Sequence, residues 1–391
     1  MKATVLLTGG GSGGHITPLL AVAAELKQLQ PELRLVYVGQ RGDRLGDIPA
    51  QDASIDEAYT VQAGKFRRYH GEGFKQLLDV PTMLKNMRDA CYVAIGIWQS
   101  WRLVGRIRPN IVFSRGGFVS VPVALGAALR RVPYITHDSD PIPSLANRII
   151  APWAAVHAVA LPKEVYAYPQ AKTVTTGVPI QKAFVPVTDK LWQQYRQQIK
   201  LSETVKLLFV IGGGQGAQRL NSAVAEMLPH LLHEYADLHI VHVVGRANET
   251  AMSAHYNEIL TPGEQGRVRT FGYMSDVFRY SGAADIIITR AGATNLAEFA
   301  VQGKACIVVP SAVLTGGHQL KNAQYLENKG AAVVIGESEL QADPNRLAKQ
   351  VSELLKDDSK RRQLGRQLAQ FAKPHATHEL AELILSQIKR S

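Results

Sequence analysis

Two glycine-rich loops contain the residues best suited to chemistry in this sequence. The first reads GGGSGGH over positions 9–15 and ends on His15, and the second reads GGGQGA over positions 212–217. Each follows a short apolar run and precedes a helical pattern. Loops of this kind let backbone N–H groups and a helix N-terminus receive a diphosphate. The sequence therefore predicts a phosphate-binding turn in each half, with a histidine beside the first.

The glycine spacing by itself also fits a dinucleotide fingerprint. That fingerprint requires an acid at the end of the next strand to bind a ribose hydroxyl. The corresponding strands should end near Gln40 and Arg246, where the sequence offers no carboxylate, and neither turn is followed by the Gly-Lys-Ser/Thr of a P-loop. The sequence therefore argues against a nicotinamide-dependent oxidoreductase.

Further polar residues come directly after other apolar runs. They include HDSD at 137–140 and RAGATNLAE at 290–298, which places Glu298 in the first turns of a helix. Glu298 could bind a nucleotide there, or it could be a solvated carboxylate favoured by the helix dipole. Asp138 and Asp140 match the DxD triplet of metal-dependent transferases, but they lie in the first half, away from the expected donor site. We interpret that match as coincidence and predict no metal site.

Strand and helix patterns alternate through both halves, which indicates an α/β protein with doubly wound parallel sheets and ligand crevices at the carboxyl ends of the strands. The first helix should begin at Pro18, with Thr17 as its N-cap. The strand candidates are 4–7, 33–38, 111–113, 133–136, 155–158, 172–175, 206–211, 238–243, 267–271, 285–289, 305–309 and 331–335.

The length of 391 residues suits two domains. We expect a first domain at 1–183, a linker at 184–204 and a second domain at 205–357. The segment 358–391 should form terminal helices, broken at Pro374, that pack back on the first domain.

Composition limits the environment and the partners. The net charge is +11, which fits nucleic acid, an anionic membrane or a phosphorylated substrate. Two distant cysteines, Cys91 and Cys306, fit a reducing compartment better than a disulfide framework. The N-terminal apolar run is too short for a signal peptide, and no stretch is long enough to span a bilayer. We therefore expect a cytoplasmic protein.

Positive charge is concentrated in the segment 64–108. It contains nine Lys/Arg and three Asp/Glu, interleaved with Trp98, Trp101 and other large apolar residues. Such a surface suits a peripheral membrane site, because lipid head groups attract the cations while acyl chains receive the rings. The alternative is a loop and two amphipathic helices whose apolar residues belong to the core.

Five motifs in the same order resemble the MurG-type family, the N-acetylglucosaminyltransferases that convert lipid I to lipid II in peptidoglycan synthesis. The family's GGTGGH, GGYVS and GGSQGA loops appear here as GGSGGH at 10–15, GGFVS at 116–120 and GGGQGA at 212–217. Its RSGA-x-T/N-x-x-E helix start appears at 290–298, and its Q-x-x-NA turn appears at 319–323. The resemblance covers nearly the whole chain.

This resemblance implies a GT-B fold, in which two Rossmann-like domains face each other across a cleft. UDP-N-acetylglucosamine would bind the second domain, and an undecaprenyl-diphosphate-linked acceptor the first. The family inverts the anomeric carbon without a bound metal or cofactor. The protein would be peripheral at the cytoplasmic face of the cell membrane, held on anionic lipid through 64–108. It would have no nucleic-acid partner, and other cell-wall synthesis proteins are candidate partners.

The resemblance also assigns roles to individual residues. His15 becomes the general base, since a histidine can take the proton of an attacking hydroxyl near neutral pH, and His137 is a second candidate. Either could instead be a structural histidine. Glu298 would bind the ribose hydroxyls, and Gln319 and Asn322 the sugar hydroxyls. The other substrate-binding positions are Met274, whose backbone would contact uracil, and Ser12, Gly13, Gly14, Asp140, Gln181, Gly214, Gln215, Ala293, Thr294, Asn295, Leu296 and Ala297.

Three positions depart from the family pattern. The family's HEQN loop ends here on Asp140, the arginine of its Gly-Asn-Pro-Val-Arg stretch is Gln181, and the serine of GGSQGA is Gly214. Two of these changes remove groups that could bind phosphate, and one adds negative charge. Compensating cations could come from Arg219, Arg246 or Arg290.

The function implied by the resemblance is transfer of N-acetylglucosamine from UDP to the C4 hydroxyl of lipid I. Two alternatives stay open. One is a related glycosyltransferase for another UDP-sugar or another lipid acceptor. The other is a non-catalytic nucleotide-sugar-binding partner of a membrane complex, against which the retained His15, Glu298, Gln319 and Asn322 argue.

Overall fold

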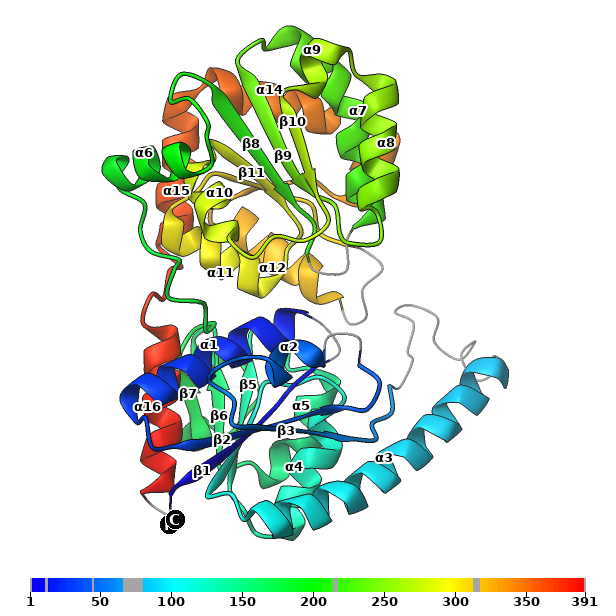
Figure 1. The fold of residues 1–391 in the computed structure, drawn as a ribbon, viewed down its shortest axis with the longest axis vertical. Helices are drawn as coiled ribbons and strands as arrows, with labels where there is room; N and C mark the ends of the chain where they lie inside the picture. Colours follow the sequence, from blue (N-terminus) through cyan, green and yellow to red (C-terminus); the bar gives the residue numbers. More distant parts are fainter. Residues whose placement is uncertain are drawn as a thin grey trace. The chain divides into compact units, whose positions relative to one another are not determined.

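The structure is a computed structural model that describes residues 2–10, 13–43, 46–65, 80–213, 217–311 and 317–389. They form two compact units. The first runs to Gln181 and resumes at Lys373, and the second runs from Lys182 to Ala372. Each unit is a twisted parallel sheet with helices on both faces (Figure 1).

The first unit is built on a parallel sheet in the order β3-β2-β1-β4-β5-β6-β7. The strand order reverses between β1 and β4, so their carboxyl ends form the topological switch point at which such sheets bind ligands. Leu6 of β1 pairs with Val36 of β2 and with Val112 of β4. The strands are β1 (Thr4–Thr8), β2 (Arg34–Gln40), β3 (Glu57–Val61), β4 (Ile111–Ser114), β5 (Tyr134–Asp138), β6 (Val156–Val159) and β7 (Thr173–Thr175).

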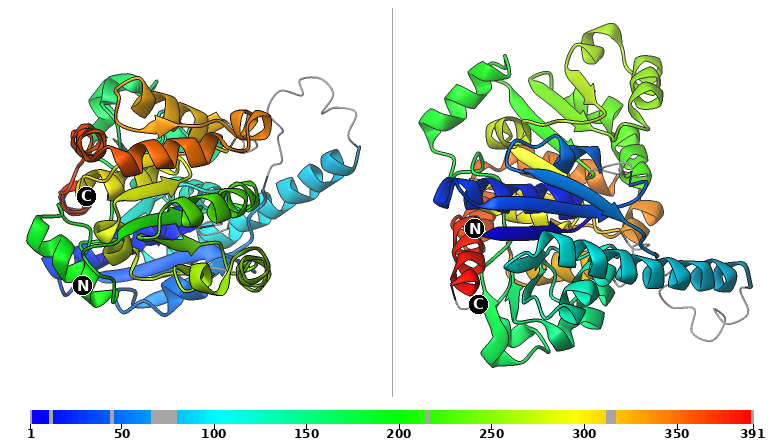
Figure 2. Two further views of the ribbon diagram at one scale, coloured as in Figure 1. Left: turned by 90° about the horizontal axis from the view of Figure 1, so that it is seen from above. Right: turned by 60° about the horizontal axis from the view of Figure 1, so that its bottom comes forward.

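Two apolar layers cover this sheet. One is supplied by α1 (Gly13–Leu29) and α16 (Ala376–Ile388), which lie side by side although they come from opposite ends of the chain (Figure 2). The other is supplied by α3 (Val80–Ile107), α4 (Ser120–Leu129) and α5 (Leu145–Ile150). Short elements complete the unit: α2 (Asp47–Ala50) and three 3-10 turns, Ala151–Trp153, Lys163–Val165 and Gln170–Lys172.

Helix α1 begins at Gly13 and contains Pro18 in its interior, whereas the sequence predicts Pro18 at its first position. The buried face of the helix explains the difference, because Ile16, Leu19 and Val22 all lie in the core. Burial of that face outweighs the backbone hydrogen bond that Pro18 cannot make. His15 therefore lies on the helix and not in the loop before it.

The second unit repeats the design in the order β10-β9-β8-β11-β12-β13, with its switch point between β8 and β11. Helices α7, α8 and α14 cover one face, and α6, α10, α11 and α12 cover the other. The strands are β8 (Lys206–Ile211), β9 (Leu238–Val243), β10 (Val268–Phe271), β11 (Ile286–Thr289), β12 (Cys306–Val308) and β13 (Val333–Val334). The helices are α6 (Asp189–Gln198), α7 (Gln218–Glu234), α8 (Glu249–Ile259), α9 (Pro262–Gln265), α10 (Val277–Ala283), α11 (Ala293–Gln302), α12 (His318–Glu327), α13 (Glu337–Ala342), α14 (Arg346–Lys356) and α15 (Asp358–Ala369).

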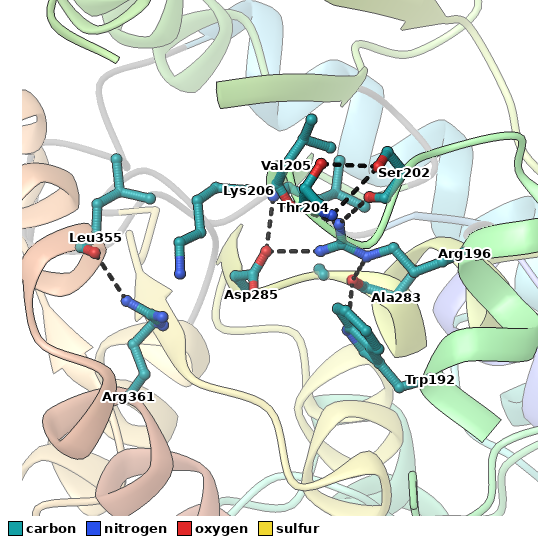
Figure 3. A network of polar contacts seen from close by, with 12 residues as sticks. Trp192, Arg196, Ser202, Thr204, Val205, Lys206, Ala283, Asp285, Leu355 and Arg361 are labelled. Carbon is teal, nitrogen blue, oxygen red and sulfur yellow. Dashed lines mark hydrogen bonds and ion pairs between the residues drawn. The ribbon is translucent and has the colours of Figure 1, made fainter. Parts of the chain in front are cut away.

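The stretch 184–204, expected to be a linker, is part of the second unit and forms α6. Arg196 anchors it: the fully buried guanidinium donates to Ala283 O at 3.0 Å, to Val205 O at 2.6 Å and to the carboxylate of Asp285 at 2.7 Å (Figure 3). Asp285 also accepts a hydrogen bond from Leu207 N at 2.7 Å. These bonds compensate the charge of Arg196 and fix α6 to the amino end of β8 and β11.

The terminal helices divide between the two units, whereas the sequence predicts that both pack on the first. Helix α15 remains on the second unit, where a Cβ on Gly365 would lie only 2.2 Å from Gly303 O. Helix α16 follows the break at Pro374 and joins the first unit. There Thr377 Oγ1 accepts from Ile180 N at 3.0 Å and donates to Ile180 O at 2.7 Å. The close Gly303–Gly365 contact packs α15 against the second unit. The apolar face of α16 instead completes the core of the first unit.

Candidate active site

The loop after β1 approaches the loop after β4 at the switch point of the first unit. Tyr37 Oη donates to Gly9 O at 2.7 Å and holds the start of the first loop. Gly117 has a φ of +83°, and a Cβ there would lie 2.7 Å from Gly10 O. Only glycine permits both the backbone conformation and the close approach. The two loops therefore bring α1 and its His15 next to the end of β4.

His15 is held in a form that can accept a proton. Its Nδ1 lies 3.2 Å from Arg115 O, and because a carbonyl can only accept, the hydrogen must be on Nδ1. Burial, followed by the positive charge of Arg115, lowers the pKa of His15 to about 4. At neutral pH the ring is therefore neutral, and Nε2 carries a lone pair. Most of the imidazole is buried, but the residue keeps some exposed surface, so in this state it can act as a general base.

His137 has a different environment. It is 1% exposed, and its Nε2 donates to Gly177 O at 2.9 Å. Burial is the main reason that the pKa of His137 is well below its ordinary value. The ring joins β5 to the segment that follows β7, so the structure gives it a local structural role.

A buried arginine lies between the two histidines, and the motif comparison does not single it out. Arg115 is 3% exposed, its Nη2 donates to Ser139 Oγ, and its Nε has no hydrogen-bond partner among the described residues. Burial lowers the pKa of Arg115 to about 10, which leaves it charged at neutral pH, and the nearby Asp140 and Asp138 oppose the shift. The signal in the sequence is a cation placed between a buried strand and a glycine pair.

The two aspartates of the DxD triplet, Asp138 and Asp140, lie in different environments. The buried carboxylate of Asp138 accepts from Tyr168 Oη at 2.8 Å and from Ser144 N at 3.1 Å. Burial raises the pKa of Asp138. Asp140 is partly exposed and near Arg115. The described part of the chain contains no cluster of three or more His, Cys, Asp or Glu side chains that could hold a metal.

The remaining expected positions of the first half are less informative. Gly13 and Gly14 are the first residues of α1, and Gln181 is exposed at the end of the first unit. Ser12, Gly214 and Gln215 lie outside the described residues, as does the part of the basic segment at 66–79.

In the second unit, β11 leads into α11 at the switch point. Helix α11 begins at Ala293 after Gly292, and its first intrahelical bond runs from Leu296 N to Gly292 O at 3.0 Å. The N–H groups of Ala293, Thr294 and Asn295 consequently have no partner within the helix and can bind an anion. Leu296 is 7% exposed and packs in the core, so its side chain faces away from this end. Ala297 follows in the same turn.

Glu298 lies one turn further along α11 and is the most unusual acid of the unit. It is 5% exposed, and within the described ranges its carboxylate has no hydrogen-bond or ion-pair partner. Burial raises the pKa of Glu298 to about 8. A buried acid without a partner is costly unless a ligand supplies hydrogen bonds. Ribose hydroxyls have the donors that this site lacks.

The other predicted donor residues surround α11. Asn322 Nδ2 donates to Ala291 O at 3.0 Å, and Gln319 Oε1 accepts from Ser311 N at 2.8 Å. Met274 is 8% exposed and belongs to the same apolar layer as Ala291. The structure thus connects the amino-terminal half of α12 to the segment after β12 through Gln319 and to the segment between β11 and α11 through Asn322.

Sequence reasoning did not identify Glu337, the first residue of α13. It is 7% exposed, and its carboxylate binds Arg290 Nη2 at 2.7 Å and Arg219 Nη1 at 2.8 Å. Its partner Arg219 belongs to α7 and lies far from Glu337 in the sequence. The local pattern around Glu337 therefore shows only an ordinary acidic residue at the start of a helix.

Family models match the chain in two places. The glycosyltransferase family 28 N-terminal domain matches residues 5–159, and the glycosyltransferase family 28 C-terminal domain matches residues 207–380. The two matches fall on the sheets of the first and second units, in the order that the resemblance implies.

Curated relatives cover the full chain. The UDP-N-acetylglucosamine–N-acetylmuramyl-(pentapeptide) pyrophosphoryl-undecaprenol N-acetylglucosamine transferase of Moorella thermoacetica is 32% identical, over 98% of this chain and 99% of its own. The protein of the same name from Clostridium novyi is 33% identical, over 92% of each chain.

Solved structures show the same fold. A MurG from Acinetobacter baumannii superposes with a TM-score of 0.69 at 23% identity, over 98% of this chain and 99% of that one. A UDP-N-acetylglucosamine 2-epimerase from Neisseria meningitidis, bound to UDP-N-acetylglucosamine, gives a TM-score of 0.69 at 12% identity, over 98% of this chain and all of that one. One fold thus serves more than one chemistry, and the sequence relatives decide the family. The chain belongs to glycosyltransferase family 28, among its MurG-type members with the GT-B fold.

Proposed function

We propose that the protein transfers N-acetylglucosamine from UDP-N-acetylglucosamine to a muramyl-peptide carried on undecaprenyl diphosphate, converting lipid I to lipid II. The observation that carries the donor half is Glu298, a buried acid without a protein partner in the described ranges, close to the free N–H groups of α11. The names of the relatives state the same reaction for those proteins.

The reaction is a direct displacement at the anomeric carbon. The acceptor hydroxyl forms a bond to that carbon while the bond to the diphosphate oxygen breaks, so the configuration inverts and UDP leaves. Nε2 of His15 takes the proton of the hydroxyl. The N-termini of α7 and α11 stabilise the charge that develops on the leaving diphosphate, and we propose no metal or cofactor for this step.

Replacing His15 tests the acceptor half. We expect His15→Ala to lower kcat by about 10²- to 10⁴-fold, because a general base contributes about that much, while the affinity for UDP stays unchanged. In the parent protein kcat/KM should stay level down to about pH 5 and fall as His15 is protonated near its pKa of about 4. Transfer assays with a soluble lipid I analogue and titrations with UDP measure both quantities.

The matched control is His230→Ala, which removes an exposed histidine paired with Glu234 on α7. It should leave transfer unchanged. Full transfer by His15→Ala would contradict the assignment of the base. Failure of the parent protein to turn over UDP-N-acetylglucosamine, together with turnover of another UDP-sugar, would show that the donor is wrong.

We also propose a peripheral position at the cytoplasmic face of the membrane, with α3 as the contact. The carboxyl-terminal turns of α3 pack in the core through Val104 and Ile107, while its preceding turns expose large apolar side chains. Arg102 stacks on Trp98 with its guanidinium carbon 5.0 Å from the ring centre. No helix in the described ranges is long and apolar enough to cross a bilayer. The exposed apolar residues are Met83, Leu84, Met87, Ile95, Trp98 and Trp101.

A further inference from the structure

Three cations stand near the carboxyl edge of the second sheet, and their environments differ. Arg290, which follows β11, is 6% exposed, and its guanidinium binds acceptors of the protein. Nη1 donates to Val309 O at 3.1 Å, and Nη2 binds the carboxylate of Glu337 at 2.7 Å. Its donors are directed into the fold. Arg290 therefore has a structural role in the absence of ligand.

Arg246 is exposed, and its guanidinium stacks on Tyr273 at 4.5 Å from the ring centre. It follows β9, which lies one strand away from the switch point between β8 and β11. The diphosphate of a nucleotide is expected at that switch point. Arg246 is therefore less well placed than a residue that follows β8 itself.

Arg219 has the required position and free hydrogen-bonding capacity. It lies in the first turn of α7, directly after the glycine loop that follows β8. Its Nη1 binds Glu337 at 2.8 Å, its side chain is 55% exposed, and its Nε and Nη2 have no partner among the residues that the structure describes. Glu337 is itself fixed by its ion pair with Arg290. Arg219 is therefore anchored through Nη1, and among the described residues nothing occupies its Nε and Nη2, which can donate to a ligand.

We propose that Arg219 binds the diphosphate of the nucleotide donor and that Glu337 positions it. This inference rests on the proposed function and adds a binding residue to its donor site. Two arginines and one glutamate leave an excess of one positive charge beside the glycine loop, where the leaving diphosphate gains negative charge.

Comparing UDP with uridine isolates the phosphate contact, because both ligands share the base and the ribose. We expect Arg219→Ala to weaken UDP binding by about 10- to 100-fold, the range of one or two charge-assisted hydrogen bonds, and to leave uridine binding unchanged. Arg219→Lys keeps the charge and should recover part of the loss. Isothermal titration of the full chain with each ligand measures these affinities, and the KM for UDP-N-acetylglucosamine should rise in parallel.

Arg366→Ala, which removes an exposed arginine in the last turn of α15, is the matched control and should leave the affinities for both ligands unchanged. The inference is overturned if Arg219→Ala binds UDP as well as the parent does, or if it loses UDP and uridine equally, since an equal loss would mean a structural role. These outcomes are separate from failure of the proposed function, which would appear as a parent protein without transfer activity.

Discussion

At the scale of single residues, Glu298 is a buried acid whose ionisation should lower the stability of the ligand-free protein. The pKa of Glu298 is raised to about 8 by burial, against 4.5 for an ordinary glutamate. Between those values the folded state holds a proton that the unfolded state has lost. Stability of the ligand-free second unit should therefore fall as the pH rises from about 4.5 to 8, and the loss is complete above the folded pKa.

Replacing the acid by its amide should remove this slope. We expect Glu298→Gln to have the stability of the parent near pH 4.5 and to exceed it by on the order of 5 kcal/mol at pH 9, since one pKa unit corresponds to about 1.4 kcal/mol. Urea unfolding at both pH values measures the difference. The same variant should bind UDP more weakly. A parent and a variant with equal stability at pH 9 would show that Glu298 has a partner in the free protein.

The sequence singles out Glu298, Asn322 and His15 as candidates because each belongs to a motif with fixed spacing, and their roles stay predictions. It could not predict that Glu298 is buried without a partner among the described residues, since burial depends on segments that pack from elsewhere. For the same reason the sequence gives Arg115 a place after a strand but no role, and it does not single out Glu337. Each resembles an ordinary charged residue at the end of a strand or the start of a helix, and only its distant contacts show its role.

At the scale of elements, the regular strands of both sheets were predicted to within a few residues because buried parallel strands are nearly continuous apolar runs. The edge strand β3 was missed, since its side chains alternate between partly buried and exposed. The start of α1 was wrong because its buried apolar face extends beyond the proline signal. The polar helix α6 was predicted to be a linker, because the hydrogen bonds that anchor it run from Arg196 to residues 283 and 285 and give no signal in the sequence around α6.

Helix α3 carries the prediction that belongs to this scale. The double substitution Met87→Ser and Trp98→Ser should weaken binding to vesicles containing phosphatidylglycerol by about 100-fold or more, because burying each large apolar side chain contributes about 1.5–3 kcal/mol. Sedimentation with vesicles measures the binding. Val165→Ser, which changes an exposed apolar residue of a 3-10 turn in the same unit, is the control. Unchanged binding by the double variant would contradict the role of α3.

At the scale of the whole molecule, the two sheets share one strand order, and the chain returns to the first unit for its last helix. The repeated glycine loops predicted the pairing of two similar units. They could not predict where the tail divides, because that depends on the Gly303–Gly365 contact and on the face of α16 that covers α1.

Removing residues 373–391 should therefore damage the first unit selectively. Leu380 and Ile384 are fully buried against the layer of Leu19 and Val22, so their loss uncovers apolar core. We expect the calorimetric transition of the first unit to shift to lower temperature or disappear, while the second unit still binds UDP. Glu382→Ala, a change at an exposed position of α16, should leave both transitions in place. Loss of UDP binding on truncation would contradict this division of the chain.

The return of α16 also determines the order in which the units can be completed during synthesis. The ribosome releases the sheet of the first unit early, but the helix that closes one of its faces is among the last segments to emerge. The second unit, which is contiguous from Lys182 to Ala372, has all its residues available before that helix exists. The half that is made first is thus completed only after the second, and part of its apolar layer stays uncovered until α16 emerges, which is the kind of exposed surface that favours aggregation.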